Sequence, residues 1–95
     1  MLHKKIIDTL RAAGIDATYT WVSGWGTLYF DIRNNGCLFQ LRVADHAEKH
    51  GGNDLNYVYQ DYDEDWLHED ITEDEWEQDV ANDVLSFVQN NIQKL

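Results

Sequence analysis

The spacing of apolar residues changes along this chain of 95 residues, and each change predicts a change of secondary structure. Between residues 2 and 13, apolar side chains recur every three or four positions, as on one face of a helix. Gly14 follows where helices commonly end, because glycine adopts the left-handed conformation without a Cβ clash. From residue 15 onward, apolar residues alternate with polar ones, which is the pattern of half-buried strands.

Four strands are expected in the alternating region. The first two cover about residues 15–21 and 28–33, and a third covers about residues 37–43. Asn34-Asn35-Gly36 separates the second strand from the third and predicts a tight hairpin, since Asn and Gly tolerate the positive φ of such turns. A polar connection then leads to a fourth strand at residues 55–60.

The third strand is expected to have one buried and one exposed side. The alternation places these residues on its core face: Cys37, Phe39, Leu41 and Val43. Gln40 and Arg42 fall between them, and we expect both side chains to point outward.

The last helix has the clearest start signal in the chain. Thr72 is expected to be the N-cap and Glu75 the N3 residue of a capping box, and Ile71 and Trp76 have the spacing of a hydrophobic staple. One apolar face follows: Trp76, Val80, Val84, Phe87, Val88, Ile92 and Leu95. The expected fold class is α+β, one domain over residues 1–95 in the order α-β-β-β-β-α. The simplest packing lays both helices on one face of an antiparallel four-stranded sheet.

Composition limits the class of protein. Hydrophobic residues make up 43% of the chain, which is too many for a disordered segment. The one cysteine, Cys37, allows no internal disulfide, which fits a reducing setting. No apolar run is long enough for a signal peptide or for the ~20 residues of a membrane span. We therefore expect a cytoplasmic protein that makes no membrane contact.

Acidic residues are concentrated in one segment, residues 61–83, which no Lys or Arg interrupts. Its twelve carboxylates are Asp61, Asp63, Glu64, Asp65, Glu69, Asp70, Glu73, Asp74, Glu75, Glu77, Asp79 and Asp83. The rest of the chain is close to neutral, so the formal net charge of −11 belongs to this segment.

Part of this charge has a structural cause. Acids in the first turn of the last helix lie at the positive end of the helix dipole, each worth about 0.3–1 kcal/mol. Glu75, Asp79 and Asp83, however, lie at i, i+4 and i+8, where like charges destabilise a helix by a few tenths of a kcal/mol per pair. Such a row of like charges beside a well-patterned core suggests selection for the electrostatic field that the charges create. The alternative is a solvated face that aids solubility.

A focused negative field favours a basic partner. It would be repelled by nucleic-acid phosphate and by anionic lipid, so we expect no direct nucleic-acid binding. A basic protein that itself binds nucleic acid is the expected partner, with carboxylates taking the place of phosphates in its groove. Trp66 is the candidate aromatic anchor. The predicted partner-binding residues are Asp61, Asp63, Glu64, Asp65, Trp66, Glu69, Asp70, Glu75, Asp79 and Asp83.

Other constellations are weaker. The run from Asp61 to Asp65 begins like a calcium loop, but Trp66 and Thr72 stand where the EF-hand needs Gly and Glu, which leaves only a nonstandard calcium site. His46 and His50 have a metal-ligand spacing, but they lack the Glu of a His-Glu-x-x-His motif. We expect no catalytic residue, no metal and no cofactor.

Three features together resemble the small inhibitor proteins carried by phages and plasmids, including anti-CRISPR and anti-restriction proteins. They are the chain length, the single α+β pattern and the acidic segment from Asp61 to Asp83. Residues 42–46, Arg-Val-Ala-Asp-His, are also similar to a short sequence common in phage proteins of unassigned role. The resemblance is one of general character and assigns no functional residue. It implies stoichiometric action and, for some such proteins, a charge layout like that of nucleic acid.

The predicted function is that of a non-enzymatic, anti-CRISPR-like inhibitor that binds a basic, nucleic-acid-handling protein. One alternative is an immunity protein or antitoxin that neutralises a basic toxin by the same physics. Another is a metal-binding or catalytic module that uses His46, His50 and His68.

Overall fold

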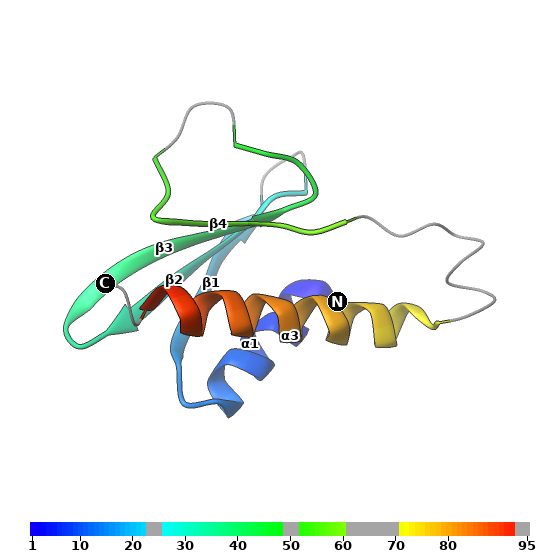
Figure 1. Ribbon diagram of the computed structural model, residues 1–95, viewed down its shortest axis with the longest axis horizontal. Helices are drawn as coiled ribbons and strands as arrows, with labels where there is room; N and C mark the ends of the chain where they lie inside the picture. The colour runs from blue at the N-terminus through cyan, green and yellow to red at the C-terminus, as the bar shows by residue number, and fades with distance from the viewer. Residues whose placement is uncertain (23–25, 49–51, 61–70, 93–95) are drawn as a thin grey trace.

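The structure, a computed structural model, describes residues 1–22, 26–48, 52–60 and 71–92. Within these ranges two helices and four strands follow in the order α-β-β-β-β-α (Figure 1). They are α1 (Leu2–Ala12), β1 (Asp16–Val22), β2 (Leu28–Asn34), β3 (Cys37–Ala44), β4 (Leu55–Val58) and α3 (Glu73–Ile92). The α+β class and the element order predicted from the sequence are confirmed.

Helix α1 ends as the sequence predicts. Gly14 has φ +84, and its N–H donates to the carbonyl of Arg11 at 3.0 Å. The N–H of Ile15 donates to the carbonyl of Leu10, also at 3.0 Å. These two bonds form a Schellman motif, which satisfies carbonyls that the helix leaves unpaired.

The hairpin between β2 and β3 is also confirmed. Asn34 pairs with Cys37, and the two residues between them have positive φ, 53 for Asn35 and 80 for Gly36. This is the geometry of a two-residue turn whose twist matches that of the flanking strands. Strand β1 pairs antiparallel with β2, with an irregularity between Tyr19 and Trp21.

The sheet is mixed, so the prediction of a fully antiparallel sheet is wrong. Its order is β1-β2-β3-β4, and β4 runs parallel to β3, with Leu55 opposite Leu41 and Val58 opposite Ala44. The connection over residues 45–54 has to bring the chain back from the end of β3 at Ala44 to the level of Leu41. This is only about 10 Å, because strands advance about 3.3 Å per residue. That distance lies well within its reach, so a parallel return is possible without a crossover helix.

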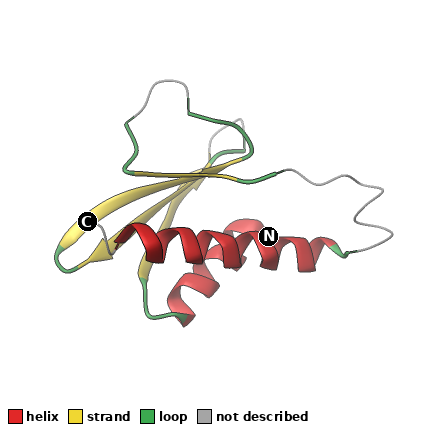
Figure 2. Ribbon diagram, in the orientation of Figure 1, coloured by secondary structure: helices red, strands yellow, loops and turns green. Residues whose placement is uncertain are grey.

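Both helices cover one face of the sheet and form the second layer (Figure 2). The core joins side chains of α1 and α3 to alternate residues of the strands, and eight large residues in it are less than 2% exposed. They are Phe30, Ile6, Leu10, Ile32, Leu41, Val43, Val84 and Val88. Phe30 pairs with Leu41 across β2 and β3, so the centre of the core lies at the middle of the sheet.

The start of β3 departs from the expected core face. Cys37, predicted to be buried, is exposed, and the neighbouring Leu38 is 57% exposed. Alternation predicts which face a side chain occupies but not where the covering layer stops. Here the hairpin extends past the described end of α3 (Figure 1), so neither described helix covers this end of β3.

Neither helix that the structure describes combines the length and the apolar character of a membrane-spanning segment.

Two leucines of β3 provide a matched test of this core. Leu41→Ala should lower the free energy of unfolding by about 2–5 kcal/mol, because it leaves a cavity in the core. Leu38→Ala, on the exposed end of the same strand, should change it by less than about 0.5 kcal/mol. Urea unfolding followed by circular dichroism measures both values, and equal losses would contradict the assigned core.

Candidate functional site

The start of α3 is held by the predicted cap. The hydroxyl of Thr72 accepts the N–H of Glu75 at 3.1 Å, and its proton is donated to the Glu75 carboxylate at 3.0 Å. The N–H of Trp76 donates to the Thr72 carbonyl at 3.0 Å. Thr72 is therefore the N-cap, and the Glu75 carboxylate meets the hydroxyl rather than the backbone N–H of the usual capping box.

Three of the predicted partner-binding residues lie in the described part of α3. Glu75, Asp79 and Asp83 are all exposed and lie on one i, i+4 row, which continues to Phe87. We call Glu75, Asp79 and Asp83 the acidic row. In the ranges that the structure describes, no ion pair joins any of the three to a Lys or Arg. Asp61, Asp63, Glu64, Asp65, Trp66, Glu69 and Asp70 lie outside the described residues.

The opposite flank of α3 is neutralised by α1, which the sequence did not reveal. The ammonium of Lys5 lies 2.8 Å from the carboxylate of Asp74, and the Met1 ammonium lies 3.5 Å from the carboxylate of Glu77. The hydrogen bond to Asp74 raises the pKa of Lys5 above its ordinary value. Helix α1 thus compensates the acids that face it and leaves the acidic row uncompensated.

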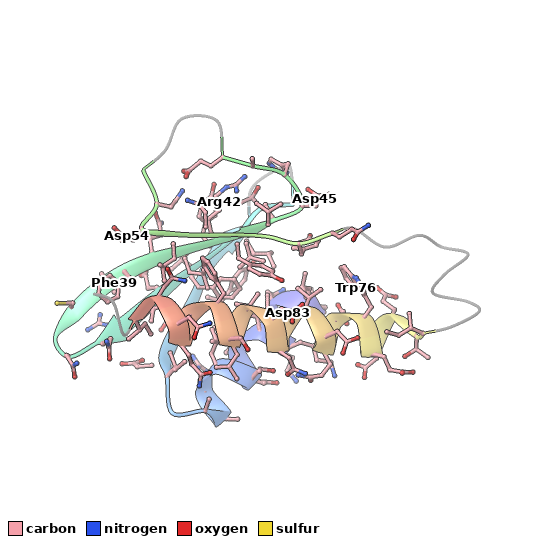
Figure 3. The ribbon with its side chains drawn as sticks, in the orientation of Figure 1. Phe39, Arg42, Asp45, Asp54, Trp76 and Asp83 are labelled. Carbon is pink, nitrogen blue, oxygen red and sulfur yellow. The ribbon has the colours of Figure 1, made fainter. Side chains whose placement is uncertain are left out.

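The acidic row lies on the flank of α3 that faces β4. The Tyr57 ring of β4 packs against Phe87 with centroids 5.6 Å apart, and Tyr59 packs edge-on against Trp76 at 5.7 Å. The Asp83 carboxylate also lies close to the Tyr57 hydroxyl. Figure 3 shows Asp83 and Trp76 on α3, with β4 running alongside the helix. Burial of the ring, followed by the negative charge of the nearby Asp83, raises the pKa of Tyr57 above 10.0.

A second polar cluster lies on the other face of the sheet, under the connection from β3 to β4. Arg42 points to that face, as expected, but it is only 4% exposed, so the expectation of an outward side chain is wrong as to burial. Its guanidinium donates to the carbonyl of His46 at 3.1 Å (Figure 3). Glu48 accepts hydrogen bonds from Asn53 and Asn56. The connection therefore covers Arg42, which alternation along β3 could not indicate.

His46 links an acid to a hydroxyl. Its Nδ1 lies 2.8 Å from the Asp45 carboxylate and its Nε2 lies 3.5 Å from the Thr27 hydroxyl. The order carboxylate, imidazole, hydroxyl is that of a nucleophilic triad. Thr27 is 2% exposed, however, so its hydroxyl is covered from an incoming substrate. The contact joins the connection to the residue before β2 and gives no support to the catalytic alternative.

The metal alternative finds no donor set in the described ranges, where no three His, Cys, Asp or Glu side chains are grouped as ligands. His50 and His68, which that alternative needs, lie outside those ranges, as does the run from Asp61 to Asp65 considered for calcium.

Comparisons with protein-family models, with characterised proteins and with solved structures gave no match for this chain.

The contact between Tyr57 and Asp83 can be tested by titration. Asp83→Asn should lower the pKa of Tyr57 toward 10.0, because it removes a charge that opposes the phenolate while leaving the burial of the ring. In the wild type the raised pKa means that the folded state keeps the Tyr57 proton to a higher pH than the unfolded state does. The contribution of the protonated Tyr57 to stability is therefore complete below the unfolded pKa and is lost as the pH rises through the folded pKa.

Absorbance of the tyrosinate band between pH 9 and 12, a range of about 3 units around the ordinary value, measures this shift. Tyr57→Phe identifies the part of the absorbance change that belongs to Tyr57. Asp16→Asn, a change of equal charge on β1, is the control. An unchanged titration in Asp83→Asn would contradict the contact.

Proposed function

We propose that this protein is a non-enzymatic inhibitor that binds a basic, nucleic-acid-handling protein in the cytoplasm through the acidic row and the acidic segment that precedes it. The proposal includes an anti-CRISPR-like role in which carboxylates occupy sites that the partner uses for phosphate. The observation that carries it is the arrangement of charge on α3. Acids that face α1 are paired, while Glu75, Asp79 and Asp83 are exposed and have no cation of this chain against them in the described residues.

The row suits recognition of arginine and lysine. Successive carboxylates at i, i+4 lie about 6 Å apart along a helix, so they offer separate points for charge-assisted hydrogen bonds. The helix that carries them is fixed by the core through buried residues such as Trp76, Val80 and Val84. A preorganised row loses little conformational freedom on binding, because only short side chains need to be ordered.

Charge at this surface would act first on the rate of association. An exposed field attracts an oppositely charged partner over about a Debye length, roughly 10 Å at 0.1 M salt. Apolar and aromatic contacts then determine specificity, and the half-buried ring of Tyr57 lies beside the row.

The identity of the partner is the first experiment. The tagged full chain, purified from its host and analysed by mass spectrometry, should retain a nucleic-acid-binding protein. An added DNA or RNA oligonucleotide should displace the chain from that protein, because both would occupy one groove. Retention of a protein that nucleic acid does not displace would overturn the mimicry part of the proposal.

Neutralising the row tests its role directly. Asp79→Asn together with Asp83→Asn should weaken binding to the purified partner by at least about tenfold, since charge-assisted bonds contribute about 1.5–3 kcal/mol each. The fold should be as stable or more stable by a few tenths of a kcal/mol, because a like-charge pair is removed.

The control for this experiment is Asp8→Asn with Asp16→Asn, which changes the net charge equally on α1 and β1. Both double variants are measured by calorimetry against the same partner. Equal affinities for the two would show that the position of the charge on α3 is irrelevant and would contradict the proposal.

Salt dependence is a separate prediction. Affinity should fall by about tenfold or more between low and physiological ionic strength, with most of the change in the association rate, because exposed charges are screened. Surface plasmon resonance at several salt concentrations measures both rates. A flat response would indicate an apolar interface instead.

A further inference from the structure

The edge of the sheet at β4 is open in the part of the chain that the structure describes. Strand order places β4 last, after β3, and among the described strands β4 pairs with β3 alone. The N–H of Tyr59 donates to the carbonyl of Ala44 at 2.9 Å, which continues this ladder. In a parallel ladder alternate residues bond the same neighbour, so the backbone groups of Asn56 and Val58 point away from β3.

These outward groups have no partner among the described residues. They provide two N–H donors and two carbonyl acceptors in a row, and the Val58 side chain beside them is 48% exposed. Such an edge is a template for one more strand.

The acidic row lies directly alongside this edge. Tyr57 of β4 contacts both Asp83 and Phe87, which are members of the same i, i+4 line as Asp79. A strand added at about 4.8 Å beyond β4 would therefore run over the flank of α3 that bears the carboxylates. In Figure 1, β4 and α3 lie one above the other, in agreement with these contacts.

The spacing of the row fits an extended chain. Asp79 and Asp83 are about 6 Å apart along the helix axis, and alternate residues of a strand are about 6.6 Å apart. Basic residues at alternate positions of an added strand would each face one carboxylate. The residues between them would point to the other face of the sheet, where Val58 offers apolar contact.

Resting on the proposed function, we infer that the β4 edge receives an extended basic segment of the partner as a fifth strand. Arginine or lysine at every second residue pairs with Asp79 and Asp83, and apolar residues alternate with them. The charge of the row selects this occupant over a second copy of the chain, because two acidic rows would meet across a dimer of β4 edges.

Three synthetic peptides separate strand addition from attraction by charge. The probe is acetyl-Arg-Val-Arg-Val-Arg-Val-Arg-amide, compared with a version N-methylated on every valine and a version N-methylated on every arginine. All three carry the same charge. In an added strand one set of residues bonds β4 and the other faces solvent, so one methylated version should bind about tenfold or more weakly and the other should not.

The protein side of the test uses Val58. Val58→Pro removes one outward N–H without touching the ladder to β3, and proline is tolerated on the free side of edge strands. Val58→Thr keeps the N–H and the shape. Val58→Pro should weaken peptide binding by about tenfold while Val58→Thr should not. Binding of the unmodified peptide should also slow hydrogen exchange at the amides of Asn56 and Val58. Thermal unfolding checks that each variant is folded, and the peptide comparison stands if Val58→Pro is not.

The outcomes distinguish this inference from the proposed function. Equal binding of all three peptides, with loss on Asp79→Asn and Asp83→Asn, would keep an acidic binding surface and overturn strand addition. Sensitivity to N-methylation without sensitivity to those substitutions would keep strand addition and overturn electrostatic recognition. Failure of the unmodified peptide to bind at millimolar concentration would overturn the inference. So would a concentration-dependent dimer, seen by analytical ultracentrifugation, that Val58→Pro abolishes.

Discussion

Burial of one sheet face under α3 is the contact on which the rest of this structure depends. Val80, Val84 and Val88 are each 6% exposed or less, so the rotation of the helix about its axis is fixed by its apolar side. Once that side faces the sheet, helical geometry places the residues of one flank against α1 and those of the other flank beside β4. The acidic row acquires its position from the core, because the buried side of the helix determines where its other sides face.

The acids on the two sides of α3 then have different neighbours. Acids toward α1 meet Lys5 and the Met1 ammonium, and in each pair one partner is exposed to solvent, which screens the attraction. Toward β4, Asp83 lies near Tyr57, whose hydroxyl carries no charge that could neutralise the carboxylate. The linear sequence shows twelve carboxylates in one segment, but the three-dimensional arrangement gives the two sides of the helix different electrostatic character.

Elements set by local rules could be predicted from the sequence. The end of α1 at Gly14 and the hairpin at Asn35 and Gly36 follow from backbone conformations that those residues adopt at low cost. The N-cap at Thr72 follows from a side chain that bonds the backbone three residues away. The apolar face of α3 follows from the helical period.

The features that could not be predicted depend on where a connection travels. A polar stretch of the length of residues 45–54 permits either an antiparallel or a parallel return, and its sequence does not favour one of them. The burial of Arg42 follows from the same connection, which crosses the face that alternation had correctly assigned as opposite to the core. The nearness of the acidic row to β4 follows in turn from the position of β4, so it could not be predicted from the sequence either.

The parallel placement of β4 also resolves a conflict at the sheet edge. Open edges expose backbone donors and acceptors, and proteins commonly protect them with charge or by keeping the strand short. Strand β4 has four residues, and the acidic row beside it would bring like charges together if two copies paired. The carboxylates that discourage pairing with a second copy are the ones that a basic strand would satisfy. Under the proposed function, one set of side chains would disfavour self-association and favour a cationic partner, which would account for like charges at i, i+4 despite their cost to the helix.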